Sequence, residues 1–189
     1  TPSGQRRIHH AYRRIYDTPH EDWNGEWQIV IVPEGVLAAR EREDLRRDLL
    51  WEGYGALAPG IFAHPAGSID SLREVLQQSG SEDRVALLKA GALDGIVTAP
   101  LRTLVHQCWH LDRLAADYRR FEERFRPTLR WLTSSADATP EQCFILRTLL
   151  IHEFRRILLR DPQLPASLLA PEWPGHTARA LCRSIYSAT

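Results

Sequence analysis

Prolines divide the last quarter of the sequence, between His152 and Tyr186, and restrict what that quarter can fold into. Asp161-Pro162 predicts the end of a helix, because proline disfavours the helical conformation of the residue before it. Leu164-Pro165 and Trp173-Pro174-Gly175 predict two further turns before a last amphipathic helix. The quarter therefore reads as helix, stop, short turn and helix, and it holds no motif of a nucleophile or a metal cage.

Helical periodicity continues through the second half of the chain. Leu101–Leu111, Asp112–Leu132 and Cys143–Leu159 are predicted to be amphipathic helices. Thr139 followed by Pro140 predicts the start of the third helix, with an N-cap and a proline at its first position. The apolar stripe of this helix is predicted to comprise Phe144, Leu146, Leu149, Leu150, Phe154, Ile157 and Leu158. Residues 99–189 are thus expected to form an all-helical C-terminal domain.

The first half alternates strands with helices. Strands are predicted at Trp27–Val32, at Ala56–His64, as two strands or one bent strand, and at Arg84–Lys89. Helices are predicted at Leu37–Gly53, with Leu45, Leu49 and Leu50 facing inward, and at Ser68–Gln78, with Ser68 as N-cap and Gly80 as terminator. The order βαββαβ is that of a ferredoxin-like domain, here over residues 26–98. The fold class is therefore α+β.

Residues 1–25 are expected to be the end of a preceding domain and a basic linker helix. Its cations, with no acidic residue among them, are Arg6, Arg7, Arg13 and Arg14. One interpretation places them beside a DNA backbone, where they add affinity that does not depend on base sequence. The other makes the helix a solvated connector, and the sequence leaves both open.

Composition narrows the function only slightly. The formal charge is zero, so bulk electrostatics does not favour nucleic acid. Three distant cysteines inside helical patterns indicate reduced core residues, as in a cytoplasmic protein. Neither a signal peptide nor an apolar run near the roughly 20 residues of a membrane span is found, so no membrane partner is expected.

Several motifs resemble the PaaX-type transcriptional repressors of phenylacetic acid degradation. In the first half they are Trp23-Asn24-Gly25-Glu26-Trp27 and Trp51-Glu52-Gly53-Tyr54-Gly55-Ala56-Leu57-Ala58-Pro59. In the second half they are Cys108-Trp109-His110-Leu111, Phe125-Arg126-Pro127, His152, Arg155-Arg156, Asp161-Pro162, Leu164-Pro165, Leu168-Leu169, Trp173, Gly175-His176 and Ala178. The resemblance covers nearly the whole chain.

The resemblance implies a homodimeric repressor of aromatic-acid catabolic genes that leaves its operator DNA when phenylacetyl-coenzyme A or a similar acyl thioester binds. No cofactor is expected. In the family a winged helix-turn-helix domain precedes the middle domain, and Thr1–Gly4 matches the junction between them. The DNA-reading domain is thus expected to be absent from this chain.

An effector of this kind requires an aromatic slot with arginines nearby for its phosphates. The predicted helices supply both, and the candidate effector residues are Trp109, His110, Arg126, His152, Arg155 and Arg156, with Phe125 beside them. His152 and the paired arginines can project to one side of a helix at spacings of three and four. For the aromatic residues, a role as core or interface anchors is the alternative.

Two other functions remain open on the sequence alone. One is a paralogous regulator that answers a different ligand. The other is an enzyme, either a metal-dependent nuclease or a thioesterase. The middle domain resembles small ferredoxin-like nucleases that carry an aspartate after the first strand, but here Pro33-Glu34 stands there without a second carboxylate. His106 and His110 share a helix face, but no glutamate lies between them as in HExxH, and a third ligand would have to come from His152 or Cys108. No catalytic or metal-binding residue is therefore predicted.

Overall fold

The structure, a computed structural model, describes residues 23–91, 99–134 and 138–189. The described residues divide into two compact units. One is a sheet unit of residues 23–91, 99–109 and 162–170, and the other is a helical unit of residues 110–134, 138–161 and 171–189. In this grouping, α4 (Ala99–Cys108) and the segment after Asp161 belong to the sheet unit, and the domain boundary at residue 99 stays a prediction. The basic residues Arg6, Arg7, Arg13 and Arg14 lie outside the described part.

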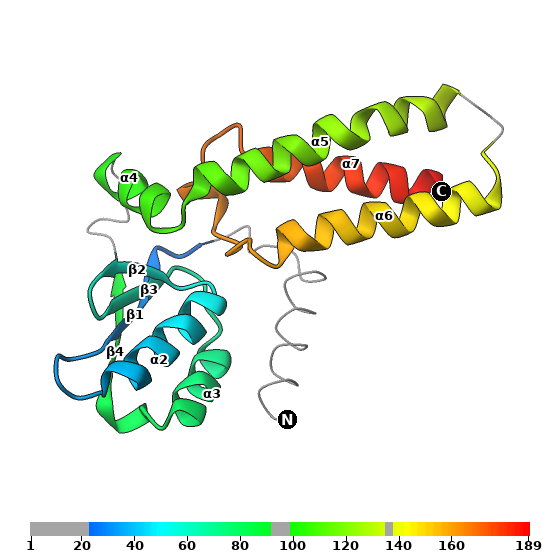
Figure 1. The fold of residues 1–189 in the computed structure, drawn as a ribbon. Helices are drawn as coiled ribbons and strands as arrows, with labels where there is room; N and C mark the ends of the chain where they lie inside the picture. The colour runs from blue at the N-terminus through cyan, green and yellow to red at the C-terminus, as the bar shows by residue number, and fades with distance from the viewer. Residues whose placement is uncertain (1–22, 92–98, 135–137) are drawn as a thin grey trace. The chain divides into compact units, whose positions relative to one another are not determined.

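The sheet unit has the predicted βαββαβ order. Its elements are β1 (Glu26–Ile31), α2 (Ala39–Trp51), β2 (Gly55–Ala58), β3 (Ile61–His64), α3 (Ile69–Ser79) and β4 (Ala86–Gly91), with a short 3₁₀ turn at Glu82–Arg84. The four strands form one antiparallel sheet in the order β2-β3-β1-β4, and α2 and α3 lie side by side on one of its faces (Figure 1). The α+β class and the ferredoxin-like arrangement predicted from the sequence are confirmed.

The core of this unit follows from strand alternation. Val30 of β1 pairs with Phe62 of β3, so both side chains point to the face that the helices cover. The buried set is Val30, Val32, Leu37, Leu45, Leu49, Tyr54, Phe62, Leu72, Val75 and Leu76. The inward orientation predicted for Leu50 is wrong, since it is 36% exposed. Leu45 and Leu49 are four residues apart and share a face, whereas Leu50 is turned about 100° from Leu49.

Helix α3 begins and ends where the sequence predicts. The Ser68 hydroxyl accepts a hydrogen bond from the Ser71 backbone amide at 3.4 Å. Gly80 closes the helix in the left-handed conformation at φ 61°, which glycine adopts at little cost. These two ends hold the apolar side of α3 against the sheet.

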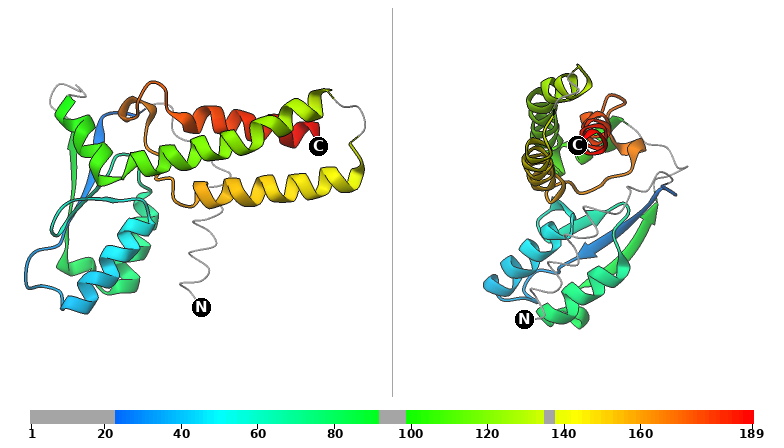
Figure 2. Two further views of the ribbon diagram at one scale, coloured as in Figure 1. Left: turned by 45° about the horizontal axis from the view of Figure 1, so that its top comes forward. Right: turned by 90° about the vertical axis from the view of Figure 1, so that its right-hand side faces the viewer.

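The helical unit contains three long helices, α5 (Leu111–Ser134), α6 (Pro140–Leu158) and α7 (Pro174–Ala188), which run alongside one another (Figure 2). Their shared core is made by Leu114, Tyr118, Phe121, Phe125, Leu150, Phe154, Ile157, Leu158, Ala178, Leu181, Cys182 and Ile185. The mostly helical C-terminal part predicted from the sequence is therefore confirmed.

Helix α6 is capped as predicted, but only four of the seven residues in its predicted stripe are buried. The Thr139 hydroxyl accepts from the Gln142 amide, and the Gln142 side chain accepts from the Thr139 amide. Leu150, Phe154, Ile157 and Leu158 are buried at spacings of four, three and one. Phe144 is 71% exposed and Leu149 is 48% exposed, so the stripe prediction is wrong at these two positions.

A buried side chain stands at each end of the proline-containing segment between α6 and α7. Asp161, the last residue before Pro162, is 7% exposed and accepts a hydrogen bond from the Tyr118 hydroxyl. Trp173 packs its ring edge-on against Tyr118, with centroids 6.1 Å apart, and Pro174 and Gly175 open α7 beneath it. Tyr118 of α5 therefore contacts both the residue before Pro162, shortly after α6 ends, and the residue before Pro174, where α7 begins.

Candidate functional site

A groove of about 100 Å³ lies between α5 and α6 in the helical unit. The lining residues on each helix recur at spacings of three or four, so each helix contributes one face, and Arg160 joins them two residues after the end of α6. The lining residues are Asp117, Arg120, Phe121, Arg124, Phe125, Glu153, Arg156, Ile157 and Arg160. The groove thus combines an apolar floor with a charged rim.

The rim is built from two carboxylates, each placed between two guanidinium groups. Asp117 lies 3.1 Å from the Arg120 guanidinium and 3.2 Å from that of Arg160. Glu153 lies 3.5 Å from the Arg124 guanidinium and 3.6 Å from that of Arg156. Four arginines against two acids leave the lining with an excess of two positive charges.

These ion pairs can rearrange at small cost. The arginine side chains are 59–73% exposed, whereas those of Asp117 and Glu153 are 20% and 28% exposed. Pairs with so exposed a partner stabilise a protein by about 0–1 kcal/mol, because water and salt screen them. The guanidinium heads can therefore turn from the carboxylates towards an anion at the rim.

The floor is aromatic and rigid. The rings of Phe121 and Phe125 are 4.8 Å apart between centroids, and Phe121 also packs on Phe154 at 5.1 Å. The Arg124 guanidinium lies over the Phe125 ring at 5.8 Å. Such contacts hold the rings in one arrangement and give a guanidinium a face to rest on.

Of the six predicted effector residues, Arg156 lies in this groove. His152 and Arg155 are exposed on α6 but do not line the groove. Arg126 pairs with Glu122 at 2.7 Å, and the same carboxylate accepts from the Thr177 hydroxyl of α7. Arg126 therefore belongs to the side of α5 that faces α7.

Trp109 belongs to the sheet unit and acts there as an anchor. Its indole N–H donates to the Gly53 carbonyl at 2.7 Å, and its ring lies 6.2 Å from that of Trp27. A β-carbon on Gly55 would stand 2.7 Å from the Trp109 ring, so the glycine is what lets the indole approach β2. His110 follows in the left-handed region at φ 49°, exposed at the entry to α5.

Five charged residues of the groove were not predicted as site residues from the sequence, namely Asp117, Arg120, Arg124, Glu153 and Arg160. A signal was available, because Asp117, Arg120 and Arg124 recur at spacings of three and four on the predicted helix Asp112–Leu132. Nothing in the sequence indicated that this face of α5 would meet Arg156 of α6 and Arg160, which follows that helix. The pairing of the two faces is a result of tertiary packing.

The acidic residue considered for a nuclease, Glu34, is exposed in a turn after β1. Within residues 23–91, 99–134 and 138–189, no group of three histidine, cysteine or acidic side chains is placed to hold a metal ion. None of the helices in this part of the chain is long and apolar enough to cross a bilayer.

Comparisons with known proteins agree with the motifs. Family models match residues 20–100, as the PaaX protein central Cas2-like domain, and residues 109–189, as the PaaX-like protein C-terminal domain. The transcriptional repressor PaaX of Escherichia coli strain K12 is 39% identical over 184 residues, which are 97% of this chain and 58% of the repressor. The chain thus spans somewhat more than half the length of this relative.

A solved structure extends the likeness to three dimensions. An uncharacterised protein from Mycobacterium tuberculosis matches with a TM-score of 0.58 and 26% identity, over 99% of this chain and 68% of that one. The two matched domains together account for most of the sequence, in the order that the resemblance of its motifs implies. The chain therefore belongs to the PaaX family, of which it carries the central Cas2-like domain and the C-terminal domain.

Proposed function

We propose that this chain is the effector-responsive body of a transcriptional repressor of aromatic-acid catabolic genes, with phenylacetyl-coenzyme A or a similar aryl-acyl thioester as effector. The observation that carries the proposal is the groove between α5 and α6, with its aromatic floor and four arginines. Family membership and the similarity to a transcriptional repressor support the regulatory role. Operator DNA is bound, in this proposal, through a winged helix-turn-helix domain preceding residue 1, in a homodimer.

The groove suits the phosphate-bearing end of such an effector. Guanidinium groups recognise phosphate oxygens through paired, charge-assisted hydrogen bonds. Arg124 and Arg156 share one carboxylate, so both can turn to a phosphate without leaving more than one acid uncompensated. The excess of two positive charges on the lining attracts a polyanion to this face.

Release from DNA follows from linkage. An effector can shift a repressor only by binding one of its conformations more tightly than the other. If it prefers a conformation in which the DNA-binding domains are misplaced, it weakens operator binding by the same factor by which operator DNA weakens effector binding. A hundredfold preference corresponds to about 2.7 kcal/mol, which is enough for a regulatory response.

Calorimetric titration tests the groove directly. Coenzyme A and phenylacetyl-coenzyme A are titrated into the unmodified chain and into Arg124→Ala and Arg156→Ala. Each substitution is expected to weaken binding roughly tenfold or more, since each removes a charge-assisted contact. The matched control is Arg46→Ala, because Arg46 is likewise exposed and pairs with an acid three residues away, on α2.

A second pair of variants separates the groove from the neighbouring face of α6. Arg155→Ala and His152→Ala are expected to leave affinity within about twofold of the unmodified chain. Loss of binding in these two, with Arg124→Ala unaffected, would move the effector site to the face of α6 that the sequence singled out. Absence of binding in every variant and in the parent chain would remove the effector site from the chain.

A paralogous regulator with another ligand is the second candidate. The groove's charges fit any acyl-coenzyme A, because they face the part that all such thioesters share. A thermal-shift panel of aryl, short-chain and long-chain acyl-coenzyme A compounds distinguishes the two. The proposed function expects the largest stabilisation from phenylacetyl-coenzyme A, and a larger shift from another member would reassign the effector.

A further inference from the structure

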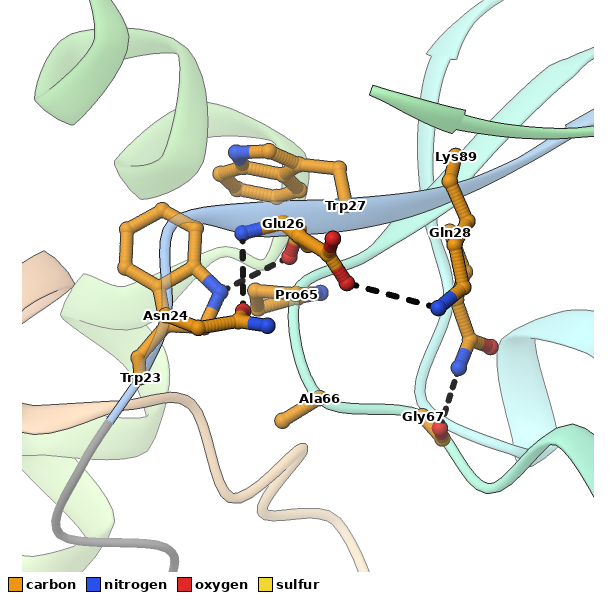
Figure 3. A pocket seen from close by; sticks show the side chains of 9 residues that line it. All are labelled: Trp23, Asn24, Glu26, Trp27, Gln28, Pro65, Ala66, Gly67 and Lys89. Atoms are coloured by element: carbon orange, nitrogen blue, oxygen red, sulfur yellow. Dashed lines mark hydrogen bonds and ion pairs between the residues drawn. The ribbon is translucent and has the colours of Figure 1, made fainter. Parts of the chain in front are cut away.

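A larger cavity, of about 320 Å³, opens in the sheet unit at the start of β1 (Figure 3). This volume falls within the range of roughly 300–1,000 Å³ that small-molecule sites occupy. It is lined by Trp23, Asn24, Glu26, Trp27, Gln28, Pro65, Ala66, Gly67 and Lys89. None of these residues was predicted as a site residue, and none belongs to the groove in the helical unit.

One wall of the cavity is set by the turn that enters β1. The Trp23 indole N–H donates to the Glu26 carbonyl at 2.8 Å, and the Glu26 amide donates to the Asn24 side chain at 3.0 Å. These bonds hold the Trp23 ring perpendicular to that of Trp27, with centroids 5.4 Å apart. The turn thus presents an indole surface to the cavity and fixes it there.

The opposite wall is the segment after β3. The Gln28 side-chain amide donates to the Gly67 carbonyl, and its oxygen accepts from the Tyr54 hydroxyl at 2.7 Å. The Ala66 amide donates to Nδ1 of the buried His64 at 2.9 Å. Both walls are therefore formed by hydrogen bonds within the unit, and a ligand would find the cavity preformed.

The charges of the cavity cancel. Nζ of Lys89 lies 3.4 Å from the Glu26 carboxylate, and the hydrogen bonds that Asn24 and Lys89 make to it lower the pKa of Glu26. Glu26 is therefore ionised at neutral pH, beside the cavity's one ammonium group. A ligand carboxylate brought to Lys89 would be repelled by Glu26, whereas an uncharged carbonyl oxygen could accept from the ammonium without that penalty.

We propose that this cavity receives a neutral aromatic acyl group, with its ring against Trp23, Trp27 and Pro65 and its carbonyl oxygen accepting from Lys89. The ammonium has three donors, and the contact with Glu26 uses one of them. The flat faces of the Trp23 and Trp27 indoles and of Pro65 favour a planar ring. This inference rests on the proposed function for the class of ligand, an aryl-acyl thioester, and it concerns the sheet unit by itself.

The probe is the phenylacetyl thioester of N-acetylcysteamine, which carries the acyl group without any phosphate. It is titrated into the chain by calorimetry and is expected to bind. Free phenylacetate is the matched ligand and is expected to bind at least roughly tenfold more weakly, because Glu26 repels its carboxylate. Equal or tighter binding of phenylacetate would overturn the neutral-ligand assignment.

Two substitutions locate the binding. Ala66→Leu fills the cavity and is expected to weaken binding of the short thioester at least roughly tenfold, while Ala86→Leu, at an exposed position of β4 outside the cavity, is expected to leave it unchanged. Lys89→Met keeps the side-chain length and removes the donor, and weaker binding is expected there too. If Ala66→Leu does not fold, as judged by circular dichroism, Lys89→Met alone decides. Unchanged affinity in the folded variants would overturn the site.

Lys89 also offers a local readout, because it is the chain's single lysine. Reductive methylation with ¹³C-formaldehyde labels Lys89 and the terminal amine and retains both charges. The short thioester is expected to shift the Lys89 methyl resonance, and coenzyme A alone is expected not to. If the short thioester binds and coenzyme A does not, the effector site in the groove is contradicted and the acyl site in the cavity is supported. If coenzyme A binds and the short thioester gives no response, the acyl site is contradicted and the groove is supported.

Discussion

At the residue scale, the helical unit depends on one buried hydroxyl–carboxylate pair. Tyr118 is fully buried and donates to Asp161, whose carboxylate also lies 3.9 Å from the Arg179 guanidinium. Burial and the neighbouring Asp161 raise the pKa of Tyr118, so the phenol stays protonated and remains the donor. The Tyr118 ring meanwhile supports Trp173 and Phe154.

Tyr118→Phe is expected to lower the free energy of unfolding by about 1–3 kcal/mol. The ring packing remains, but Asp161 loses a hydrogen bond while it stays buried, and a buried acceptor deprived of a donor costs about that much. Urea denaturation measures the change, with Tyr186→Phe as control, since Tyr186 is 46% exposed. A change within about 0.5 kcal/mol for Tyr118→Phe would show that the hydroxyl contributes nothing measurable.

Thiol reactivity should separate Cys182 from Cys143. Burial raises the pKa of the Cys182 thiol to about 11 from an ordinary value near 9, and the reactive thiolate is scarce at neutral pH. Iodoacetamide is therefore expected to modify the partly exposed Cys143 well before Cys182, as mass spectrometry of the labelled chain would record. Equal labelling rates in the folded chain would contradict this.

The same shift has a consequence for stability against pH. Because the folded state holds the Cys182 proton more tightly than the unfolded state, the thiol makes its full contribution to the free energy of unfolding below about pH 9. This contribution declines as the pH rises from about 9 through about 11.

At the scale of the elements, prolines, N-cap residues and a terminal glycine correctly predicted where helices begin and end. Thr139, Ser68 and Gly80 act at helix ends because their conformations and side chains satisfy backbone groups that a helix leaves free. The buried half of α6 was predictable from its spacing, and the exposed half was not, since Phe144 and Leu149 are as apolar as the residues that are buried. Local sequence determines that a helix forms, but tertiary packing determines how much of it is covered.

Gly175→Ala tests the tight packing at the start of α7. Alanine is the better helix former by about 1 kcal/mol, but its β-carbon would stand 2.5 Å from Nε1 of Trp173. Trp173 is buried against Tyr118, so relief requires a shift of a packed ring and is expected to cost about 1–3 kcal/mol. Thermal unfolding measures the loss against Ser184→Ala, an exposed position on the same helix. A stabilised Gly175→Ala chain would refute this account.

The candidate site was less predictable than the fold. Arginine pairs on α6 indicated anion recognition, and Arg156 lies in a groove that fits this, but its partners Arg120, Arg124 and Arg160 come from faces whose meeting the sequence does not encode locally. The Trp23–Trp27 cavity was not foreseen at all, because its walls are joined by hydrogen bonds between residues 39 and 26 positions apart. Trp109, one of the aromatic candidates, packs instead on the glycine of β2.

At the scale of the whole molecule, a formal charge of zero conceals two concave surfaces of different electrostatic character. The groove of the helical unit carries excess positive charge on exposed side chains, and the cavity of the sheet unit has no net charge and opens between hydrogen-bonded walls. The proposed ligand of the groove is accordingly a phosphate group, and that of the cavity is an uncharged acyl group. Salt acts on these two kinds of contact differently, since mobile ions screen exposed charges and leave apolar burial intact.

We therefore expect salt to separate the two affinities. Between about 0.1 M and about 1 M sodium chloride the Debye length falls from about 10 Å to about 3 Å, so binding of coenzyme A to the groove should weaken roughly tenfold or more. Binding of the phenylacetyl thioester of N-acetylcysteamine should stay within about twofold, because an uncharged ligand in a neutral cavity has no long-range attraction to lose. Calorimetric titrations of both ligands across a salt series provide the measurement. A parallel decline of both affinities would mean that one charged site binds both ligands, and constant affinity for coenzyme A would mean that the exposed arginines do not hold its phosphates.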